Sequence, residues 1–566
     1  MQHAVISPGS RSAPLVISFN KQEGINCLRV IDERSAGFFA LGMAQQLHAP
    51  VALICTSGSA VLNYGPAVAE AFYQRVPLLV ITADRPDEWV DQGEGQAIRQ
   101  HGVLALHMKR SIQLPRDAKD DLSRWHCGRL INEAIDATLL PVPGPVHLNI
   151  PFDEPLYGTT TAVGDTRSIA QVMTEPFILP EHARWLIRQL SSSPKVMVLA
   201  GQGVWSDGMK TQLLQLASLP QVTVHTEATS NLDDPAFITC IDRVIEGVDE
   251  RNENDLKPDL LITVGGAIVS KRGSRCCGSG SRHSIGTSMW GSGTTIPTRV
   301  YARHRGSPGG LLRADRGAVK GNESIYREAW RMVDERTRGL HHRSIAEAPF
   351  CDLTVFNTLN DRIPGDSDVH LANSTPARYA QLFDRVRSHR WFSNRGTSGI
   401  DGCTSTAVGA AQATGKLTTL ISGDTAFCYD SNAFWNEHLS PLLKVIVIDN
   451  GGGNIFRYID GPDKDPELLP WFEAPHTRSI EAGEELRPAV LPCQRPRLRS
   501  KPGWTSSTPH DKPAVLHITT DPLISPRCCA TISPNSAPHD RCATVAFVAP
   551  WRPISLIHEF SHLDPH

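Results

Sequence analysis

Mainly apolar runs of strand length alternate with segments of helical periodicity through the first 150 residues. Residues 51–55 and 76–83 are such runs, whereas residues 35–47 carry apolar side chains at helical spacing, at Phe38, Phe39, Leu41 and Met43. Apolar strands that alternate with helices are typical of a parallel sheet covered on both faces. The pattern therefore predicts a doubly wound α/β domain.

The same alternation recurs twice more in the 566-residue chain. A second region begins with the apolar run at 196–201 and a third begins near Asp352, while a polar stretch near 155–180 is typical of a linker. The strand-like run at 514–519 is expected to close the third sheet. We therefore predict three doubly wound parallel-sheet α/β domains, at residues 1–160, 180–345 and 350–520, followed by an irregular tail at 521–566.

Composition excludes several classes of protein. Hydrophobic residues make up 40% and charged residues 20% of the chain, which excludes a largely disordered protein. The 56 basic and 59 acidic residues give a net charge of -3, so no overall field favours a nucleic acid or an acidic membrane. No apolar run approaches the roughly 18 residues of a membrane-spanning helix. We expect a cytoplasmic protein with no nucleic-acid or membrane partner.

Two stretches depart from the α/β pattern. Residues 273–317 hold ten Gly, seven Arg and one acidic residue in 45 positions, and residues 481–566 hold 13 of the 41 prolines. Adjacent cysteines occur in both, but they lack the spacing of a zinc site. Because the pattern breaks off abruptly and returns in register, we interpret these stretches as out-of-frame translation or decayed sequence. Other reading frames without an α/β pattern would contradict this interpretation.

An acid and an amide follow two apolar strands of the third region. Asp424 follows the run at 418–422, and Asn450 follows the run at 443–448, 26 positions after Asp424. The carboxyl ends of parallel strands meet at one edge of a sheet, where α/β folds bind ligands. A carboxylate, an amide oxygen and a free backbone carbonyl suit Mg²⁺ together with phosphate oxygens. Because Gly-Asp and Asn-Gly are also common turn dipeptides, two ordinary turns remain an alternative.

The Gly-Asp and Asn pair resembles the signature of thiamine-diphosphate enzymes, and six further motifs narrow the resemblance. In chain order, the motifs are Ser7-Pro8-Gly9-Ser10-Arg11-Ser12, Asp32-Glu33-Arg34, Thr56-Ser57-Gly58, Thr82-Ala83-Asp84-Arg85-Pro86, Gln96-Ala97-Ile98-Arg99-Gln100 and Ser393-Asn394-Arg395-Gly396-Thr397-Ser398-Gly399-Ile400-Asp401-Gly402. All six resemble the SEPHCHC synthases of menaquinone biosynthesis. The resemblance covers roughly residues 1–272 and 350–475.

This resemblance implies a pyrimidine-binding domain at 1–160, without the helix that usually precedes its first strand, a central domain at 180–345, and a domain at 350–520 that binds diphosphate and metal. The implied cofactors are thiamine diphosphate and Mg²⁺ or Mn²⁺. The implied reaction decarboxylates 2-oxoglutarate and adds the resulting succinyl carbanion to isochorismate. In this family two subunits share each site, which implies a homodimer or homotetramer.

The resemblance also assigns roles to single residues. Glu33 and Gln96 are the implied catalytic residues, and Glu33 would hydrogen-bond the pyrimidine ring of the cofactor. Ile400, Asp424, Asn450 and Gly452 complete the implied cofactor site, and the last three of these would hold the metal. The implied substrate site consists of Arg11, Arg85, Lys271, Arg272, Ser374, Arg378, Arg395, Ile455 and Phe456.

Several alternatives remain open at this stage. Guanidinium groups hold carboxylates bidentately, but any single arginine is equally explained as a solvated surface charge. For Glu33 the alternative is an acid in the first turn of a helix, and for Ile400 it is plain core; the surrounding motifs favour the catalytic interpretation of Glu33. For the whole chain, the rival functions are another thiamine-diphosphate carboligase of the acetolactate-synthase type and a non-catalytic homologue. The many arginines argue against small neutral substrates.

Overall fold

The computed structural model describes 1–154, 156–159, 168–169, 179–203, 205–270, 324–384, 389–457, 467–476, 513–525 and 528, and the backbone of 298–302 and 489–493. Lys271, Arg272, most of the 273–317 stretch and nearly all of the predicted tail at 521–566 lie outside these residues. No helix in the described part of the chain is both long and apolar enough to cross a membrane.

The first sheet is wholly parallel and has the strand order β2-β1-β3-β4-β6-β5. Its strands are β1 (His3–Ile6), β2 (Asn26–Arg29), β3 (Val51–Cys55), β4 (Leu78–Asp84), β5 (Arg110–Gln113) and β6 (Val146–Pro151). Its helices are α1 (Ala13–Lys21), α2 (Glu33–Leu47), α3 (Ser59–Asn63), α4 (Gly65–Gln74) and α5 (Asp121–Leu139). Every residue of β3 and β4 is buried, as their apolar runs predict.

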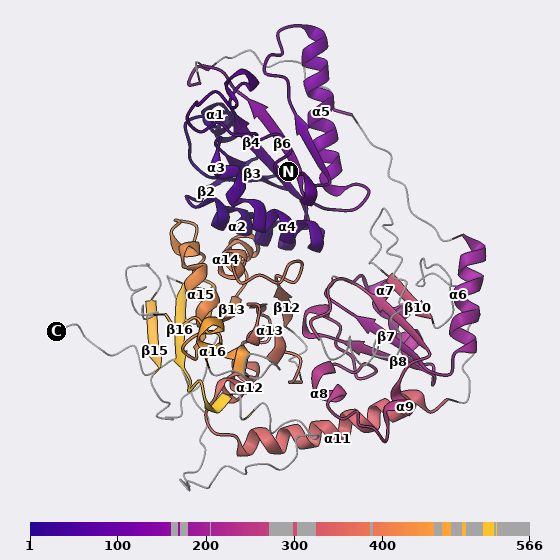
Figure 1. The fold of residues 1–566 in the computed structure, drawn as a ribbon. Helices are drawn as coiled ribbons and strands as arrows, with labels where there is room; N and C mark the ends of the chain where they lie inside the picture. The colour runs from indigo at the N-terminus through magenta and orange to yellow at the C-terminus, as the bar shows by residue number, and fades with distance from the viewer. Residues whose placement is uncertain are drawn as a thin grey trace, which may run out of the picture.

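The second sheet has the order β10-β9-β7-β8 and is parallel except for its edge strand β10. Its strands are β7 (Val196–Ala200), β8 (Val222–Thr226), β9 (Leu260–Val264) and β10 (Thr298–Ala302). Its helices are α6 (Pro180–Ser192), α7 (Asp207–Ala217), α8 (Ile241–Ile245), α9 (Glu253–Leu256) and the long α11 (Tyr326–Glu347). In Figure 1, α11 passes below α8 and α9 toward the third sheet.

The third sheet is wholly parallel, with the order β12-β11-β13-β14-β16-β15. Its strands are β11 (Asp368–Leu371), β12 (Arg390–Ser393), β13 (Thr418–Gly423), β14 (Leu443–Asp449), β15 (Ala489–Cys493) and β16 (Ala514–Thr519). Its helices are α12 (Asp352–Arg362), α13 (Thr375–Tyr379), α14 (Cys403–Thr414), α15 (Asp424–Tyr429) and α16 (Leu469–Phe472). The predicted strand 514–519 joins this sheet, but between β14 and β15 rather than at its edge. The predicted fold class, three doubly wound α/β sheets, is confirmed.

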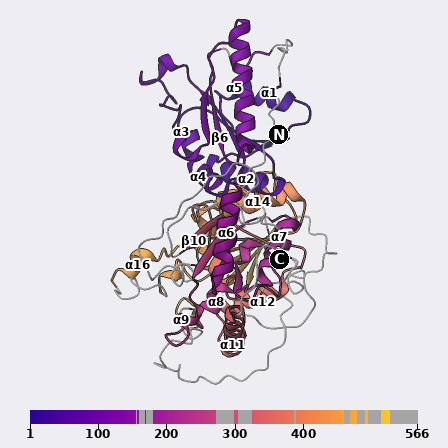
Figure 2. The same cartoon turned by 90° about the vertical axis from the view of Figure 1, so that its right-hand side faces the viewer.

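Helices α2 and α14 pack at very short range where the first and third sheets meet (Figures 1 and 2). A Cβ atom added at Gly42 of α2 would lie 2.0 Å from the carbonyl oxygen of Thr406. A Cβ added at Gly409 of α14 would likewise lie 2.0 Å from the carbonyl oxygen of Phe39. Only glycine permits this approach. The contact therefore fixes the first residues of α2 relative to the loop that precedes α14.

Candidate active site

Asp424 and Asn450 emerge from adjacent parallel strands at the carboxyl edge of the third sheet. Asp424 follows β13 as the first residue of α15, and Asn450 follows β14. Both residues are buried, and Asp424 Oδ2 and Asn450 Oδ1 have no hydrogen-bond partner in the described part of the chain. Buried oxygens without a donor are costly unless a cation binds there. The predicted pairing of these two strand ends is therefore present in the fold.

Asp449 and His476 complete a cluster around Asp424. One ligand atom from each of these three residues lies within 4.8 Å of the other two. Carboxylate and amide oxygens suit Mg²⁺, whereas an imidazole is more typical of a transition metal. Asp449 and His476 were not predicted, because neither belongs to the Asp424 and Asn450 pattern.

The pKa values of the two acids in this cluster, Asp424 and Asp449, are shifted in opposite directions from the ordinary value. Burial and, to a smaller extent, the neighbouring Asp449 carboxylate together raise the pKa of Asp424 to about 6. Burial acts in the same direction on Asp449, but hydrogen bonds from His517, at 2.8 Å, and from the Gly451 N–H lower the pKa of Asp449 to about 2. A divalent cation would stabilise both carboxylates in their charged forms. The electrostatics therefore favour a bound cation.

Asp352, a buried acid in the first turn of α12, orients Asn450. The Asn450 Nδ2 donates to Asp352 Oδ2 at 2.8 Å, which leaves the amide oxygen of Asn450 free to bind a ligand. Thr520 also donates to the Asp352 carboxylate, and burial raises the pKa of Asp352. The role of Asp352 was missed, because it lies 98 positions before Asn450 and no local motif connects the two.

Gly452 lies in a backbone conformation that requires glycine. Its φ is 110°, and an added Cβ would lie 2.4 Å from the Ala474 carbonyl oxygen. The Gly453 N–H donates to Thr425 Oγ1 at 3.3 Å, so this glycine turn packs against the start of α15. These residues together fit a diphosphate held through a divalent cation, with Gly452 available as a backbone ligand.

Glu33 begins α2 but does not cap it. The capping residue is Asp32, whose carboxylate accepts from the Ser35 N–H at 2.9 Å. The Glu33 side chain is half-buried and forms no ion pair within the described residues. Burial raises the pKa of Glu33, and the charge of Asp32 adds to this effect. A half-buried carboxyl group that forms no ion pair with the described residues and has a raised pKa suits proton exchange at neutral pH.

Ser374, Arg378 and Arg395 follow the adjacent strands β11 and β12. Arg395 donates from one terminal nitrogen to Asn373 Oδ1 at 2.9 Å, and its Nε is buried without a partner in the described chain. Burial lowers the pKa of Arg395, and the neighbouring charge of Arg378 lowers it further, whereas Glu227 opposes both. The structure thus brings two of the predicted arginines together, with donor capacity left for an anion.

The N-terminal candidates Arg11 and Arg85 are each bound to groups of their own domain. Arg11 is buried, donates to the Phe152 carbonyl at 3.1 Å and lies 3.4 Å from Glu154. Arg85 donates to the Gly95 carbonyl at 3.0 Å and lies 3.5 Å from Glu94. Gln96 is exposed with a left-handed φ of 58°. Among the described residues, no hydrogen bond or ion pair joins Arg11, Arg85 or Gln96 to the third sheet.

The predicted apolar residues lie beside the cluster of acids. Ile455 and Phe456 belong to the short 3₁₀ helix Asn454–Arg457 that follows the glycine turn, and the Phe456 ring lies 5.5 Å from that of Phe472. Ile400 packs against Ala372, Cys403 and Ala426 at the strand ends. This position places Ile400 at the carboxyl edge of the sheet rather than in its core.

The chain before the undescribed Lys271 and Arg272 is held by a buried acid. Glu227 accepts from the N–H groups of Val269 and Ser270, both at 2.7 Å. Burial raises the pKa of Glu227 to about 7, although these two hydrogen bonds oppose the shift. Glu227 was not predicted, because it lies on a different strand end from the residues that it holds.

The fold and the site together place the chain in the class of thiamine pyrophosphate enzymes. The chain has three doubly wound sheets, and Asp424 and Asn450 lie together at the carboxyl edge of the third. Residues 1–103 match the family described as thiamine pyrophosphate enzyme, N-terminal TPP binding domain.

Three relatives carry the name 2-succinyl-5-enolpyruvyl-6-hydroxy-3-cyclohexene-1-carboxylate (SEPHCHC) synthase. The Porphyromonas gingivalis protein is 39% identical over 83% of this chain and 83% of its own length. The Flavobacterium johnsoniae protein is 39% identical over 84% and 85%, and the Desulfotalea psychrophila protein is 35% identical over 92% and 96%. The chain belongs to the SEPHCHC synthase family, which confirms the resemblance found in its motifs.

Proposed function

We propose that this chain is a thiamine-diphosphate- and Mg²⁺-dependent SEPHCHC synthase of menaquinone biosynthesis. It would join 2-oxoglutarate to isochorismate with loss of CO₂, in the cytoplasm, as a homodimer or homotetramer; Mn²⁺ is the alternative metal. Family membership supports the reaction. The observation that carries the cofactor assignment is the pair of buried oxygens without donors, Asp424 Oδ2 and Asn450 Oδ1, at one sheet edge.

The residues at this edge of the third sheet have separate tasks in this proposal. Asp424, Asn450 and the Gly452 carbonyl would hold the cation, and Asp352 fixes which atom of the Asn450 amide faces it. Thiamine diphosphate supplies, when bound, the nucleophilic carbon and the electron sink that decarboxylation needs. Glu33 would exchange a proton with the pyrimidine ring, a task that matches its raised pKa and its freedom from ion pairs.

The substrates are anions, and the arginines would bind their carboxylates. Arg378 and Arg395 repel each other when no anion lies between them, because both are charged and Arg395 is partly desolvated. A bound carboxylate relieves this repulsion and can accept two parallel N–H bonds from a guanidinium group. Arg11 and Arg85 would add positive charge, and Ser374 and Gln96 would add neutral hydrogen bonds.

The apolar residues Ile455 and Phe456 would limit access of water to the bound substrates. Exclusion of water slows the protonation that would otherwise end the reaction before the carbon–carbon bond forms. Ile400 would contact and support the bound cofactor, which is consistent with its packing against Ala426 near the start of α15.

The test is consumption of 2-oxoglutarate by the full chain, loaded with thiamine diphosphate and Mg²⁺ and verified as loaded by calorimetry. We expect CO₂ release that depends on isochorismate. Consumption of pyruvate instead would indicate the acetolactate-synthase type of reaction. A loaded protein that turns over neither substrate would refute the proposal and identify a non-catalytic homologue.

A further inference from the structure

Glu70, in the middle of α4, is a fully buried acid that the proposed reaction does not use. Its exposed fraction is 0%, and α4 lies on the side of the first domain that faces the third domain (Figures 1 and 2). A buried carboxylate requires several donors to offset its desolvation. Its donors come mostly from the loop at residues 393–402, which we call the Arg395 loop.

Four donors converge on the Glu70 carboxylate. Oε1 accepts from the Gly396 N–H at 2.7 Å and from Gln74 Nε2, one turn further along α4. Oε2 accepts from the Thr397 N–H and from Thr397 Oγ1, each at 2.6 Å. Hydrogen bonds to a charged acceptor are about twice as strong as neutral ones. The two residues that follow Arg395 are therefore bound to a different domain.

The loop also approaches α4 too closely for a side chain at position 396. A Cβ added at Gly396 would lie 2.7 Å from the Glu70 carbonyl oxygen and 3.1 Å from its carboxylate. The close approach and three of the four donors act on the same two residues of the loop, so both restrain its position.

A second set of contacts fixes the residue where the loop begins. The Ser393 carbonyl accepts from Gln74 at 3.2 Å and from Gln202 at 3.0 Å, and Gln202 Nε2 also lies 3.1 Å from Gln74 Oε1. Gln74 belongs to the first domain, Gln202 follows β7 of the second sheet, and Ser393 ends β12 of the third. The Arg395 N–H donates to the same carbonyl at 3.0 Å. The backbone of Arg395 is thus held where all three domains meet.

We propose that Glu70 is a positioning residue for substrate binding, which fixes the Arg395 loop so that the Arg395 guanidinium faces a substrate carboxylate. The proposal rests on the proposed function for the identity of the ligand, but the ordering of the loop by Glu70 does not. Glu70 does not bind Arg395 directly, because its oxygens are occupied by the four donors. Its effect on substrate binding passes through the backbone of residues 396 and 397.

The chemistry of Glu70 predicts the effect of its closest substitute. In Glu70→Gln the shape is retained, but one oxygen becomes an NH₂ group that faces N–H donors. At least one backbone N–H then loses its acceptor while buried, and the repulsion between donors moves the loop. Thr397→Val, in contrast, removes only one of the four donors and should have a smaller effect.

Hydrogen exchange of the full chain tests the ordering of the loop independently of any activity. We expect Glu70→Gln to raise the exchange rate of the amides of residues 395–402 by about tenfold or more, the loss expected for one charge-assisted hydrogen bond. Ser35→Ala is the matched control. It removes a buried hydrogen bond of 2.8 Å between Ser35 and Ser405 in the same domain contact, away from the loop. Unchanged exchange in Glu70→Gln, or an equal rise in the control, would overturn the proposal.

A double-mutant cycle tests the functional part. We expect Glu70→Gln to raise the KM for one carboxylate substrate about tenfold with a smaller change in kcat, and to add little when Arg395 is already replaced by Ala. Full additivity of Glu70→Gln and Arg395→Ala would show that Glu70 does not act through Arg395. If the wild type does not turn over either substrate, the proposed function fails, whereas the exchange result still decides the role of Glu70.

Discussion

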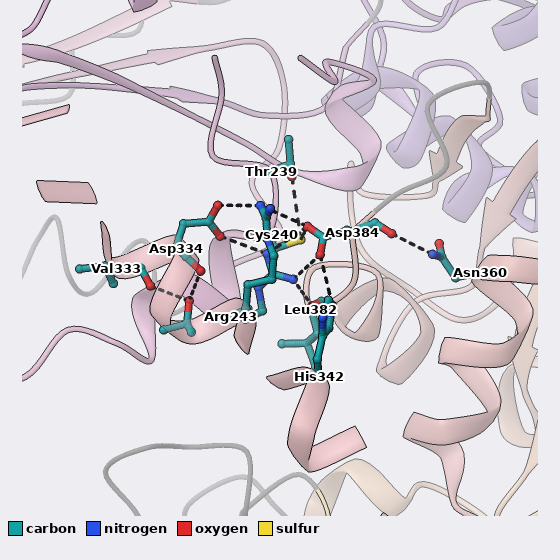
Figure 3. A network of polar contacts seen from close by, with 11 residues as sticks. Thr239, Cys240, Arg243, Val333, Asp334, His342, Asn360, Leu382 and Asp384 are labelled. Carbon is teal, nitrogen blue, oxygen red and sulfur yellow. Dashed lines mark hydrogen bonds and ion pairs between the residues drawn. The ribbon is translucent and has the colours of Figure 1, made fainter. Parts of the chain in front are cut away.

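Arg243, in α8, is the most deeply buried cation of a polar network that joins the second domain to the third (Figure 3). Its guanidinium binds Asp384 through two bonds, of 2.9 Å and 3.0 Å, and binds Asp334 of α11 at 3.1 Å. The Arg243 side chain is only 2% exposed. We predict that Arg243→Met, which retains an unbranched apolar stem but removes the guanidinium group and its charge, destabilises the contact between these two domains.

The expected loss in free energy depends on which partners Asp384 and Asp334 keep after Arg243 is replaced. Removal of one member of a buried ion pair typically costs about 3–5 kcal/mol, because the other member stays buried without a partner. The Asp384 side chain is 40% exposed, and Asp334 keeps an ion pair with Arg338 at 2.8 Å. Water and Arg338 therefore compensate in part. We expect a loss near the lower limit, about 3 kcal/mol.

Native-state hydrogen exchange is the appropriate assay, because it reports the opening of α8 and α11 without assuming two-state unfolding of a multidomain chain. A loss of about 3 kcal/mol corresponds to a fall in protection of roughly 150-fold. Arg338→Met is the matched control. It removes an ion pair to the same Asp334 from a side chain that is 44% exposed, and should cost less than about 1 kcal/mol.

Two results would refute the reasoning. Equal losses in Arg243→Met and Arg338→Met would show that burial does not set the strength of these ion pairs. A loss below about 1 kcal/mol in Arg243→Met would show that the acids find other partners at no cost.

Three further predictions concern the charge, the cofactor site and the domain contact. Burial raises the pKa of Asp384, but the hydrogen bond and charge of Arg243 outweigh it and hold that pKa below its usual range. The stability lost in Arg243→Met, measured by native-state hydrogen exchange, should therefore be full above about pH 5 and shrink as the pH falls further. Asp424→Asn should abolish the Mg²⁺-dependent rise in melting temperature with thiamine diphosphate, while Glu33→Gln should retain that rise and lose most turnover in the CO₂ assay. Gly409→Ala should lower the melting temperature, because its Cβ would collide with the Phe39 carbonyl oxygen. The expected loss in the free energy of unfolding is about 3 kcal/mol or more.

The strands were predictable because their signal is local. The runs at 51–55 and 514–519 form strands with the predicted bounds, since each is a mainly apolar segment of strand length. The segment at 59–74 shows the limit of a local signal, because it does not form one continuous helix. It is divided at Tyr64 into α3 and α4, and a proline in the first turn of α4 restricts the preceding backbone.

The candidate site was predictable only where a motif lies at a strand end. Asp424 and Asn450 could be predicted to meet, because the ends of adjacent parallel strands always do. Asp352 and Glu70 could not, because they act on residues 98 and 326 positions away. Single acids on helices occur throughout any sequence, so only the packing of whole domains distinguishes these two. The roles assigned to Lys271 and Arg272 remain predictions.

The surroundings of Arg395 show how a protein can partly bury a cation and still leave it able to bind a ligand. Two buried acids from two other domains, Glu70 and Glu227, lie close enough for their charges to favour the charged form of Arg395. Neither acid forms an ion pair with the guanidinium, because each is occupied by backbone N–H groups. The acids thus offset part of the desolvation cost of Arg395 without occupying its donors. A direct salt bridge would stabilise the arginine more strongly, but it would also compete with the substrate carboxylate for the same N–H groups.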